Sequence, residues 1–423
     1  MEFLEFIVFD VLGQASLLVG LMSFIGLVLQ RKPGVEVMSG TLKTIAGFLV
    51  FGIGAAAASE VLSNFQTLFS TGFHLQGVLP LAEAVTALAQ NDFPLIISLV
   101  MVFGFCANLI FARFTKFKYI FLTGQHSLYF SALLTIMFKA LGLSDMVTIV
   151  AGSIILGAAA CLYPAICQKY MRMITGGDNI AMGHYCTLAY GLSGWIGEKV
   201  GDKSKGTEHL NFPKWLSFLK DYVVSIGLSI GIFFYASAFA AGQAEVEAMS
   251  NGINWLVFPL IQSLTFAGGL YVVISGVRLF LGEIVPAFVG ISEKLIPDAK
   301  PALDCPSVFP YAPTATVIGF MSAYIAGIIC MFIFAILNMP VIIPVAGPYF
   351  FIGATAGVFG NASGGWKGCV AGAFVTGILI AVGPALIYPV MEVVGLAGSS
   401  FPETDFNLVG LVIYWFGQLF GMI

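Results

Sequence analysis

Three short polar segments interrupt a chain that is otherwise almost wholly apolar, and their residue types could bind a ligand or take up a proton. They are Thr123-Gly124-Gln125-His126, Gly183-His184-Tyr185 and Asp304-Cys305-Pro306. A carboxylate in the middle of a membrane costs about 3 kcal/mol on insertion scales, so such residues usually face a water-filled cavity or a substrate. We therefore expect the functional groups of this protein in these three segments.

Asp304 lies in a stretch that cannot continue as a plain helix, because prolines occur at 297, 301, 306, 310 and 313 and proline lacks an amide donor. Irregular backbone at membrane depth is tolerated only where it is buried in protein or lines a cavity. The neighbours Leu303, Cys305, Val308 and Phe309 are too apolar for a free loop. We interpret Asp304 as a site residue, and a solvated aspartate in a cytoplasmic loop is the alternative.

His184 follows Gly176-Gly177-Asp178-Asn179, a composition typical of a turn and a helix N-cap. The pattern predicts that His184 lies about a turn and a half into a short helix. Its imidazole could bond a hydroxylated ligand or pass a proton. A structural histidine that caps a carbonyl is the alternative.

Gln125, His126 and Tyr129 stand near the start of an apolar run. The i, i+4 spacing puts Gln125 and Tyr129 on one helix face. Contact with a substrate and polar contact between helices are both open interpretations.

Glu83 lies in Leu81-Ala82-Glu83-Ala84-Val85, a helical pattern too short to span a membrane. The tip of a re-entrant hairpin fits this segment, and so does an exposed loop. Farther along, Arg278 and Glu283 are expected to form an ion pair beside a broken span.

Composition indicates a polytopic membrane protein: 59% of the 423 residues are hydrophobic, 9% are charged and the mean hydropathy is +0.97. Nothing in it suggests nucleic-acid binding. The first 29 residues lack a basic start and a cleavage signal and are expected to remain as a first helix.

The seven cysteines show no CxxC spacing, so neither a disulfide frame nor a zinc site is indicated. No phosphate-binding GxxxxGK[ST] motif, no Ser/His/Asp order and no metal-ligand spacing stands out, so we expect no cofactor and no metal, and any covalent chemistry from a partner.

Eleven apolar runs approach the length of about 20 residues that spans a membrane. They cover residues 4–29, 41–62, 94–112, 119–140, 146–167, 221–243, 254–280, 315–338, 341–360, 368–391 and 406–422. The chain is therefore predicted to be an all-α membrane protein. Five spans before the polar segment 176–220 and six after it are compatible with two inverted five-helix repeats, at about 1–175 and 221–423, with one extra helix at the end.

The polar segment 176–220 contains Trp195, Pro213 and Trp215 and is expected to form an amphipathic helix on the cytoplasmic face. Lysines and arginines cluster in it and after spans one, three and five, and these clusters are predicted to be cytoplasmic. The connections 63–93, 244–253 and 393–405 contain acids but no Lys or Arg, so they are predicted to lie outside. The N-terminus is then outside and the C-terminus cytoplasmic.

Several segments resemble the ascorbate-type membrane component, enzyme IIC, of the bacterial phosphoenolpyruvate-dependent phosphotransferase system. The matching stretches, in family order, lie at residues 40–48, 122–124, 183–184, 276–278, 288–297, 302–305, 312–313, 359–361 and 364–366.

The resemblance implies a single IIC unit over residues 1–423 of a homodimer in the bacterial cytoplasmic membrane. Core (substrate) and dimerisation parts would be interleaved, and the core would carry L-ascorbate or a related sugar across by an elevator motion. It also implies cytosolic IIA and IIB partners, with IIB phosphorylating the sugar from a phosphocysteine. The chain would then be the transport subunit of a phosphotransferase complex, with no phosphorylated residue of its own.

Carried over by position, the family's binding residues fall on Ala82, Glu83, Gln125, Tyr129, His184, Tyr185 and Asp304. Only His184 and Asp304 keep the family identities. The histidine expected at 125 is displaced to His126, which we include as a candidate. Asp304 would orient the attacking hydroxyl or accept its proton, and His184 would fix the sugar ring.

Five changes among seven positions leave the substrate open, because a pocket built to bond hydroxyls discriminates strongly. A neutral sugar or polyol is the rival of ascorbate. A proton-coupled secondary transporter that uses the same acidic and imidazole groups as a relay is the alternative of another class.

Overall fold

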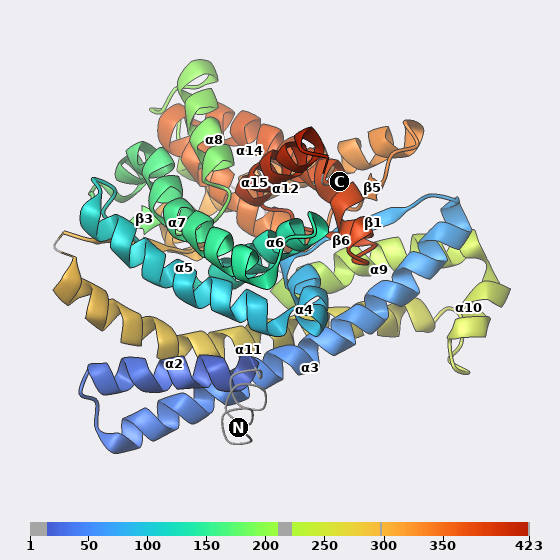
Figure 1. Ribbon diagram of the computed structural model, residues 1–423. Helices are drawn as coiled ribbons and strands as arrows, with labels where there is room; N and C mark the ends of the chain where they lie inside the picture. The colour runs from blue at the N-terminus through green and yellow to red at the C-terminus, as the bar shows by residue number, and fades with distance from the viewer. Residues whose placement is uncertain (1–14, 210–221, 297, 422–423) are drawn as a thin grey trace, which may run out of the picture.

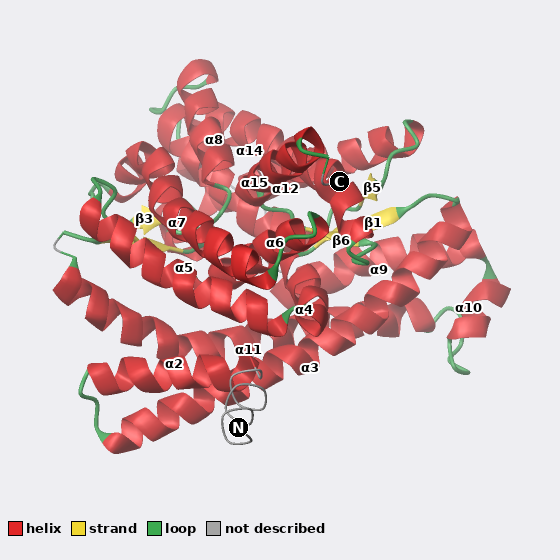
Figure 2. Cartoon of the chain, viewed as in Figure 1, coloured by secondary structure: helices red, strands yellow, loops and turns green. Residues whose placement is uncertain are grey.

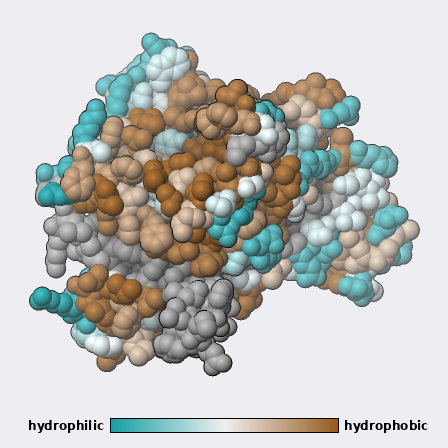
Figure 3. Space-filling view, in the orientation of Figure 1, coloured by the Kyte–Doolittle hydropathy of each residue, from teal (hydrophilic) through white to brown (hydrophobic). Residues whose placement is uncertain are grey.

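The computed structural model describes residues 15–209, 222–296 and 298–421. These residues form helices joined by six short strands (Figures 1 and 2). Apolar side chains cover much of the visible surface around α5, α6 and α15, and polar ones gather toward its edges (Figure 3). Such an apolar surface suits a protein that is surrounded by lipid.

Four long or apolar helices pack against one another and form what we call the long-helix layer. They are α2 (Ala15–Leu29), α3 (Gly34–Phe73), α9 (Tyr222–Ala241) and α11 (Phe258–Leu295). The short α10 (Gln243–Met249) follows α9 at a bend of 114°. In Figure 1 this layer lies along the lower side of the molecule.

The remaining long helices form a second group, the site layer, in the upper part of Figure 1. They are α5 (Pro94–Phe114), α7 (Asp145–Thr175), α8 (Thr187–Val200), α12 (Pro313–Ile336), α14 (Ala354–Val393) and α15 (Thr404–Leu419). Further helices and helical turns complete it. These are α4 (Ala82–Asp92), α6 (Gly124–Ala140), α13 (Ala346–Pro348), the π-helical turn Tyr349–Gly353, and the 3₁₀ turns Thr207–His209, Cys305–Ser307 and Phe309–Tyr311.

Two small parallel sheets lie inside this helical frame. One has the order β5-β1-β6 and contains β5 (Val341–Ile342), β1 (Gly77–Pro80) and β6 (Ser399–Ser400). The other has the order β2-β4-β3 and contains β2 (Tyr119–Phe121), β4 (Lys300–Leu303) and β3 (Ala181–Met182). Because the strands in each sheet are parallel, their carboxyl ends meet at one edge. Each strand runs, within five residues, into a helical turn or helix.

The strands correct the expectation of a purely helical chain. Residues 119–140, predicted as one span, form β2 followed by the 17-residue helix α6. Residues 341–360 form β5, α13 and a π-helical turn before α14 begins. The physical reason is that broken helices free backbone N–H and C=O groups, and short strands pair them within the protein.

Five helical segments in the described part of the chain are long and apolar enough to cross a membrane, and α9 with α10 adds a sixth if the bent pair is one span. The count of eleven is therefore not confirmed. The predicted spans 341–360 and 368–391 belong to one helical run, which breaks at Gly365 (φ 60°, ψ −154°). A Cβ at Gly365 would overlap the carbonyl oxygens of Asp202 and Lys205, so this break needs glycine.

Part of the central polar segment 176–220 belongs to the packed site layer. Its residues 181–200 provide β3 and α8, and α8 packs closely on α14. Gly197 allows this contact, because a Cβ there would overlap Ser363 and the Gly360 carbonyl. Trp195 lies on the exposed side of α8, whereas the predicted interfacial residues Pro213 and Trp215 lie outside the described residues.

The crossing of α3 and α11 yields a prediction about stability. A Cβ at Gly276 of α11 would overlap the Phe51 amide nitrogen and the Gly47 carbonyl oxygen of α3. Gly276→Ala should therefore force the two helices apart and lower the free energy of unfolding by about 1–3 kcal/mol, as overpacking does. Thermal unfolding of the detergent-solubilised protein measures this change.

Gly268→Ala is the matched control, because Gly268 lies on the same helix and nothing is within 4 Å of its added Cβ. It should leave the Tm unchanged or raise it. Equal Tm values for the two variants would contradict the close packing of α3 on α11.

Candidate functional site

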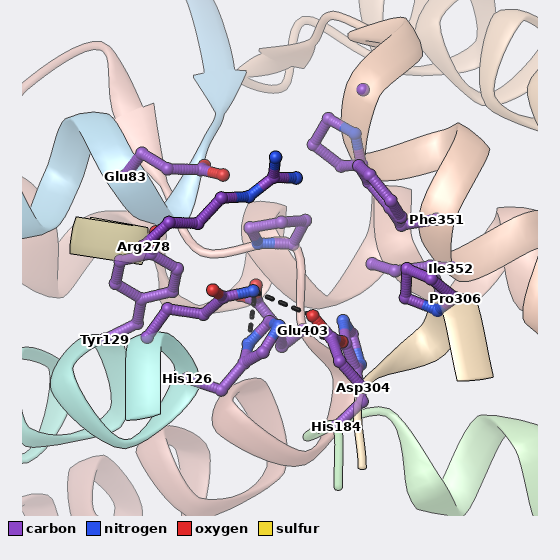
Figure 4. A pocket seen from close by; sticks show the side chains of 14 residues that line it. Glu83, His126, Tyr129, His184, Arg278, Asp304, Pro306, Phe351, Ile352 and Glu403 are labelled. Atoms are coloured by element: carbon purple, nitrogen blue, oxygen red, sulfur yellow. Dashed lines mark hydrogen bonds and ion pairs between the residues drawn. The ribbon is translucent and has the colours of Figure 1, made fainter. Parts of the chain in front are cut away.

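A cavity of about 710 Å³, including its open mouth, lies where the carboxyl ends of the two sheets face each other. Its wall is polar on one side, and Pro306, Pro348, Phe351 and Ile352 line it with apolar groups on another (Figure 4). A wall of this mixed kind suits a ligand with hydroxyl groups and an apolar ring face.

The β2-β4-β3 sheet brings together the polar segments singled out in the sequence. After β2, the first turn of α6 presents Gln125 and His126. His184 follows β3, and Asp304 follows β4 directly. Three segments far apart in the chain thus meet because their strands are parallel neighbours.

The β5-β1-β6 sheet supplies the facing groups. Glu83 lies in the first turn of α4, which follows β1. Glu403 precedes α15 after β6, and Gly347 belongs to α13 after β5. The two sheets therefore frame the cavity in equivalent ways.

Asp304 is held by two hydrogen bonds. Its Oδ1 accepts from the amide of Cys305 at 2.7 Å and so caps the 3₁₀ turn that follows. Its Oδ2 accepts from Nε2 of Gln125 at 2.8 Å. The side chain remains 30% exposed and lines the cavity, so a ligand can reach it.

His126 lies between two carboxylates. Its Nε2 is 3.8 Å from Oδ1 of Asp304, and its Nδ1 is 3.9 Å from Oε1 of Glu403. Both distances are too long for hydrogen bonds. Asp304 and Glu403 lie outside the candidate membrane spans. Burial raises the pKa of both carboxyl groups, so each is more readily protonated than a surface acid.

His184 is fixed by Tyr190. Nδ1 of His184 lies 3.0 Å from the Tyr190 hydroxyl, which is also 3.3 Å from Sγ of Cys305. Nε2 of His184 is therefore the nitrogen available to a ligand. The rings of His126 and His184 lie edge to face, with centroids 4.1 Å apart.

An ion-pair network braces the β2-β4-β3 sheet near the starts of β3 and β4. Asp178, in the turn before β3, binds Arg172 at 2.8 Å and Lys300 of β4 at 2.6 Å. The Arg172 guanidinium, then Lys300 and Gln168, hold the pKa of the Asp178 carboxyl well below its usual range. Asp178 therefore stays ionised and joins α7 to β4.

Asp405 fixes the start of α8 from a distant part of the chain. The fully buried carboxylate accepts from the Thr187 amide and hydroxyl, both at 2.8 Å, and from the Leu188 amide at 3.1 Å. A carboxylate at a helix N-terminus satisfies free amides and complements the helix dipole. Because His184 lies just before α8, Asp405 also holds the loop that carries His184.

Several expectations from the sequence are corrected here. His184 lies in the loop before α8 and not inside a helix, because Gly176 (φ 70°) ends α7 and the strand β3 intervenes. Glu283 pairs with Lys43 at 3.0 Å and not with Arg278. Glu403 and Asp405 of the connection 393–405 are also buried, and the side of the membrane predicted for this connection stays a prediction.

The other predicted residues divide into two groups. Glu83, Gln125, His126 and Tyr129 line the cavity with His184 and Asp304. Ala82 and Tyr185 are fully buried behind it, and Tyr185 stacks on Phe121 with ring centroids 4.5 Å apart.

Arg278 and Glu403 line the cavity but were not expected there. Arg278 is the one Arg or Lys among the lining residues that the structure describes, and it reaches the cavity from α11 of the long-helix layer (Figure 4). A lone arginine in an apolar run was the available signal for Arg278. Glu403 gave no such signal, because an acid beside Pro402 reads as an ordinary loop residue.

Comparisons with known proteins give a family model and a curated relative. The family model "EIIC-GAT: PTS system sugar-specific permease component" matches residues 10–405. A protein of Mycoplasma pneumoniae named "Ascorbate-specific PTS system EIIC component" is 28% identical over 413 residues, which cover 84% of this chain and 62% of that protein. The chain thus spans less than two thirds of the length of this relative.

The cap on α8 can be tested. Asp405→Ala removes the acceptor of the Thr187 amide and hydroxyl and of the Leu188 amide, and each lost partner costs about 1–3 kcal/mol. We expect a lower Tm and weaker binding of any ligand that contacts His184, although Asp405 does not line the cavity. Thermal unfolding and equilibrium ligand binding measure these effects.

Asp145→Ala is the control, because Asp145 also lies in the first turn of a helix but is exposed and pairs with Lys139. It should change neither quantity appreciably. Wild-type binding by the Asp405→Ala protein would show that the cap does not position His184.

Proposed function

Since the chain belongs to the EIIC-GAT family of sugar-specific permease components of the phosphotransferase system, we propose that it carries a sugar across the membrane for phosphorylation by separate phosphocarrier proteins. The observation that carries this proposal is the placement of Asp304. It lies at the carboxyl end of β4, held by Gln125, in a cavity with both hydrogen-bonding and apolar walls. That wall fits a sugar better than a lipid chain.

Asp304 would act on the sugar hydroxyl that attacks the phosphoryl group. In this step the hydroxyl oxygen forms a bond to phosphorus, the phosphorus–sulfur bond of the partner's phosphocysteine breaks, and the hydroxyl proton passes to Asp304. Burial suits Asp304 to accept this proton. His184, oriented by Tyr190, would hold the ring, so that the protein contributes mainly by positioning.

We propose an anionic sugar acid of the ascorbate type as the substrate, as the name of the Mycoplasma relative suggests for that protein. Arg278 reaches into the cavity, and the starts of α4, α6 and α15 adjoin it with their positive dipole ends. Asp304 and Glu403 have raised pKa values, which reduces the negative charge that they present.

The positions that differ from the family pattern then argue less strongly against ascorbate as the substrate. Ala82 and Tyr185 do not line the cavity, so their identities do not alter its wall. His126 lies beside His184 and can supply the imidazole that position 125 lacks. Glu83, Gln125 and Tyr129 remain the positions that would tune the choice between ascorbate and a neutral sugar.

We also propose that the chain contains two inverted repeats, about 15–200 and 222–419. Both contain two long-helix-layer helices, then a central strand (β1 or β4), and then further strand–helix units that end in α8 or α15. Each sheet takes one strand from one repeat and two from the other. On this view α15 is the counterpart of α8 and not an extra helix.

The two layers suggest how transport would occur. Nearly all cavity residues belong to the site layer, and Arg278 comes from the long-helix layer. We propose that the site layer moves as an elevator against a long-helix layer that forms the homodimer. The N-terminus outside, the C-terminus in the cytoplasm, the bacterial inner membrane and the IIA and IIB partners are parts of this same proposal.

One observation favours a second function. The row Asp304, His126, Glu403 consists of three titratable groups with spacings of 3.8 and 3.9 Å. Small movements would make it a proton relay for a proton-coupled transporter. Uptake that survives loss of the IIB phosphocysteine but stops with an uncoupler would favour this function over phosphotransfer.

The role of Asp304 predicts a clear phenotype. Asp304→Asn keeps the side-chain shape but cannot accept the hydroxyl proton, so sugar phosphorylation coupled to uptake should fall by roughly 10²- to 10⁴-fold, the usual contribution of general base catalysis. Uptake of radiolabelled ascorbate by cells, followed by separation of the phosphorylated product, measures this loss.

Glu283→Gln is the control, because this carboxylate pairs with Lys43 away from the cavity. Normal accumulation of phosphorylated sugar by Asp304→Asn would contradict the proposed role.

Arg278 provides the test of substrate charge. Arg278→Gln should weaken ascorbate binding on the order of 10- to 100-fold, from the 1.5–3 kcal/mol of a hydrogen bond to a charged group. Binding of a neutral polyol should change little. Arg113→Gln, at the end of α5, is the matched control for loss of a positive charge. Equal losses for the anion and the polyol would argue against an anionic substrate.

A further inference from the structure

We propose that the floor of the cavity is a binding site for a divalent transition-metal ion, with His126, His184 and Asp304 as ligands. One ligand atom from each of these residues lies within 4.8 Å of the other two. His126 and His184 are buried, and Asp304 is partly exposed toward the cavity. Three donors thus face one another from three different segments of the chain.

The donor set indicates the kind of ion. Two imidazole nitrogens and one carboxylate oxygen suit Zn²⁺ and Co²⁺ better than Mg²⁺ or Ca²⁺, which prefer oxygen ligands only. Zinc bonds of about 2.0–2.1 Å place tetrahedral ligands roughly 3.3–3.4 Å apart. Nε2 of His126 and Oδ1 of Asp304, at 3.8 Å, need only a small approach. The fourth position would open toward the cavity.

Two of the three ligands are held by a hydrogen bond to a neighbour, and the third faces a carboxylate, as ligands of metal sites often do. The Tyr190 hydroxyl holds Nδ1 of His184 at 3.0 Å and leaves Nε2 for the ion. Glu403 faces Nδ1 of His126 at 3.9 Å, a nitrogen that has no hydrogen-bond partner among the described residues. Gln125 binds Oδ2 of Asp304 and leaves Oδ1 toward the histidines. These neighbours would fix the rings for binding.

The carboxyl groups among the lining residues also suit a cation at this point. Glu83, Asp304 and Glu403 supply three carboxyl groups, and Arg278 is the one Arg or Lys that faces them among the described lining residues. A bound ion would occupy groups that a sugar needs. If the proposed function holds, ion and sugar therefore exclude each other, whereas ion binding itself does not depend on that function.

Cobalt binding tests the site directly. The full chain, purified in detergent with an affinity tag that contains no histidine, is titrated with Co²⁺ and then with Zn²⁺. We expect one Co²⁺ per chain with the visible absorption of a four-coordinate site, and loss of that absorption when Zn²⁺ displaces it. Absence of a saturable cobalt spectrum would overturn the proposal.

Variants locate the ion. His126→Gln and His184→Gln should each weaken Co²⁺ binding at least 10-fold, and Glu403→Gln should weaken it about 10-fold through His126. His74→Gln is the control, since His74 ends α3 far along the chain from these loops and contributes no ligand. Wild-type affinity for Co²⁺ in both His126→Gln and His184→Gln would overturn the proposal. Unchanged Tm values would show that a loss of Co²⁺ binding is not due to misfolding.

The experiment also separates this inference from the proposed function. A protein that binds Co²⁺ but no sugar keeps the metal site and argues against sugar transport. A protein that binds ascorbate but gives no cobalt spectrum contradicts the metal site and leaves the proposed sugar transport standing. Where both bind, Zn²⁺ should raise the apparent Kd for ascorbate in wild type, and binding that is independent of Zn²⁺ would contradict a shared site.

Discussion

The need to pair backbone groups inside the protein is the constraint on which the rest of this structure depends. A chain that breaks its helices at membrane depth exposes amides and carbonyls that lipid cannot satisfy. Here two three-stranded parallel sheets pair them, each with a central strand from one half of the chain and flanking strands from the other. Because parallel strands end at one edge, the same solution collects the polar loops around a single cavity.

Carboxylate side chains then stiffen those loops. Asp405 caps α8, Asp304 caps the 3₁₀ turn after β4, and Asp178 ties α7 to β4. These carboxylates come from different parts of the chain, but each binds groups at the end or the start of a helix or strand. The cavity is therefore built from preorganised polar groups, and Arg278 is the charged group that the long-helix layer adds to it. A ligand held by both layers would link its own binding to their relative position.

Much of the cavity could be predicted from the sequence, because polar residues in apolar runs are rarely accidental. His184, Asp304, Gln125 and Glu83 were found in this way and line the cavity. Glu403 could not be predicted as a cavity residue, because its burial depends on the pairing of β6 with β1, which lies more than 300 residues earlier in the chain. The strands β2 and β5 are three and two residues long and leave no period-2 pattern, so residues 119–140 and 341–360 were read as helices. Likewise the His126, His184 and Asp304 cluster has no motif spacing, because tertiary structure alone unites its three loops.

The most direct test of the central claim, that the two sheets frame the sugar site, is a cryo-electron microscopy map of the protein with ascorbate. The account predicts ligand density between Asp304 and His184 on one side and Phe351 on the other, with Arg278 within reach of the ligand. Ligand density elsewhere in the protein, with this cavity unchanged, would contradict it.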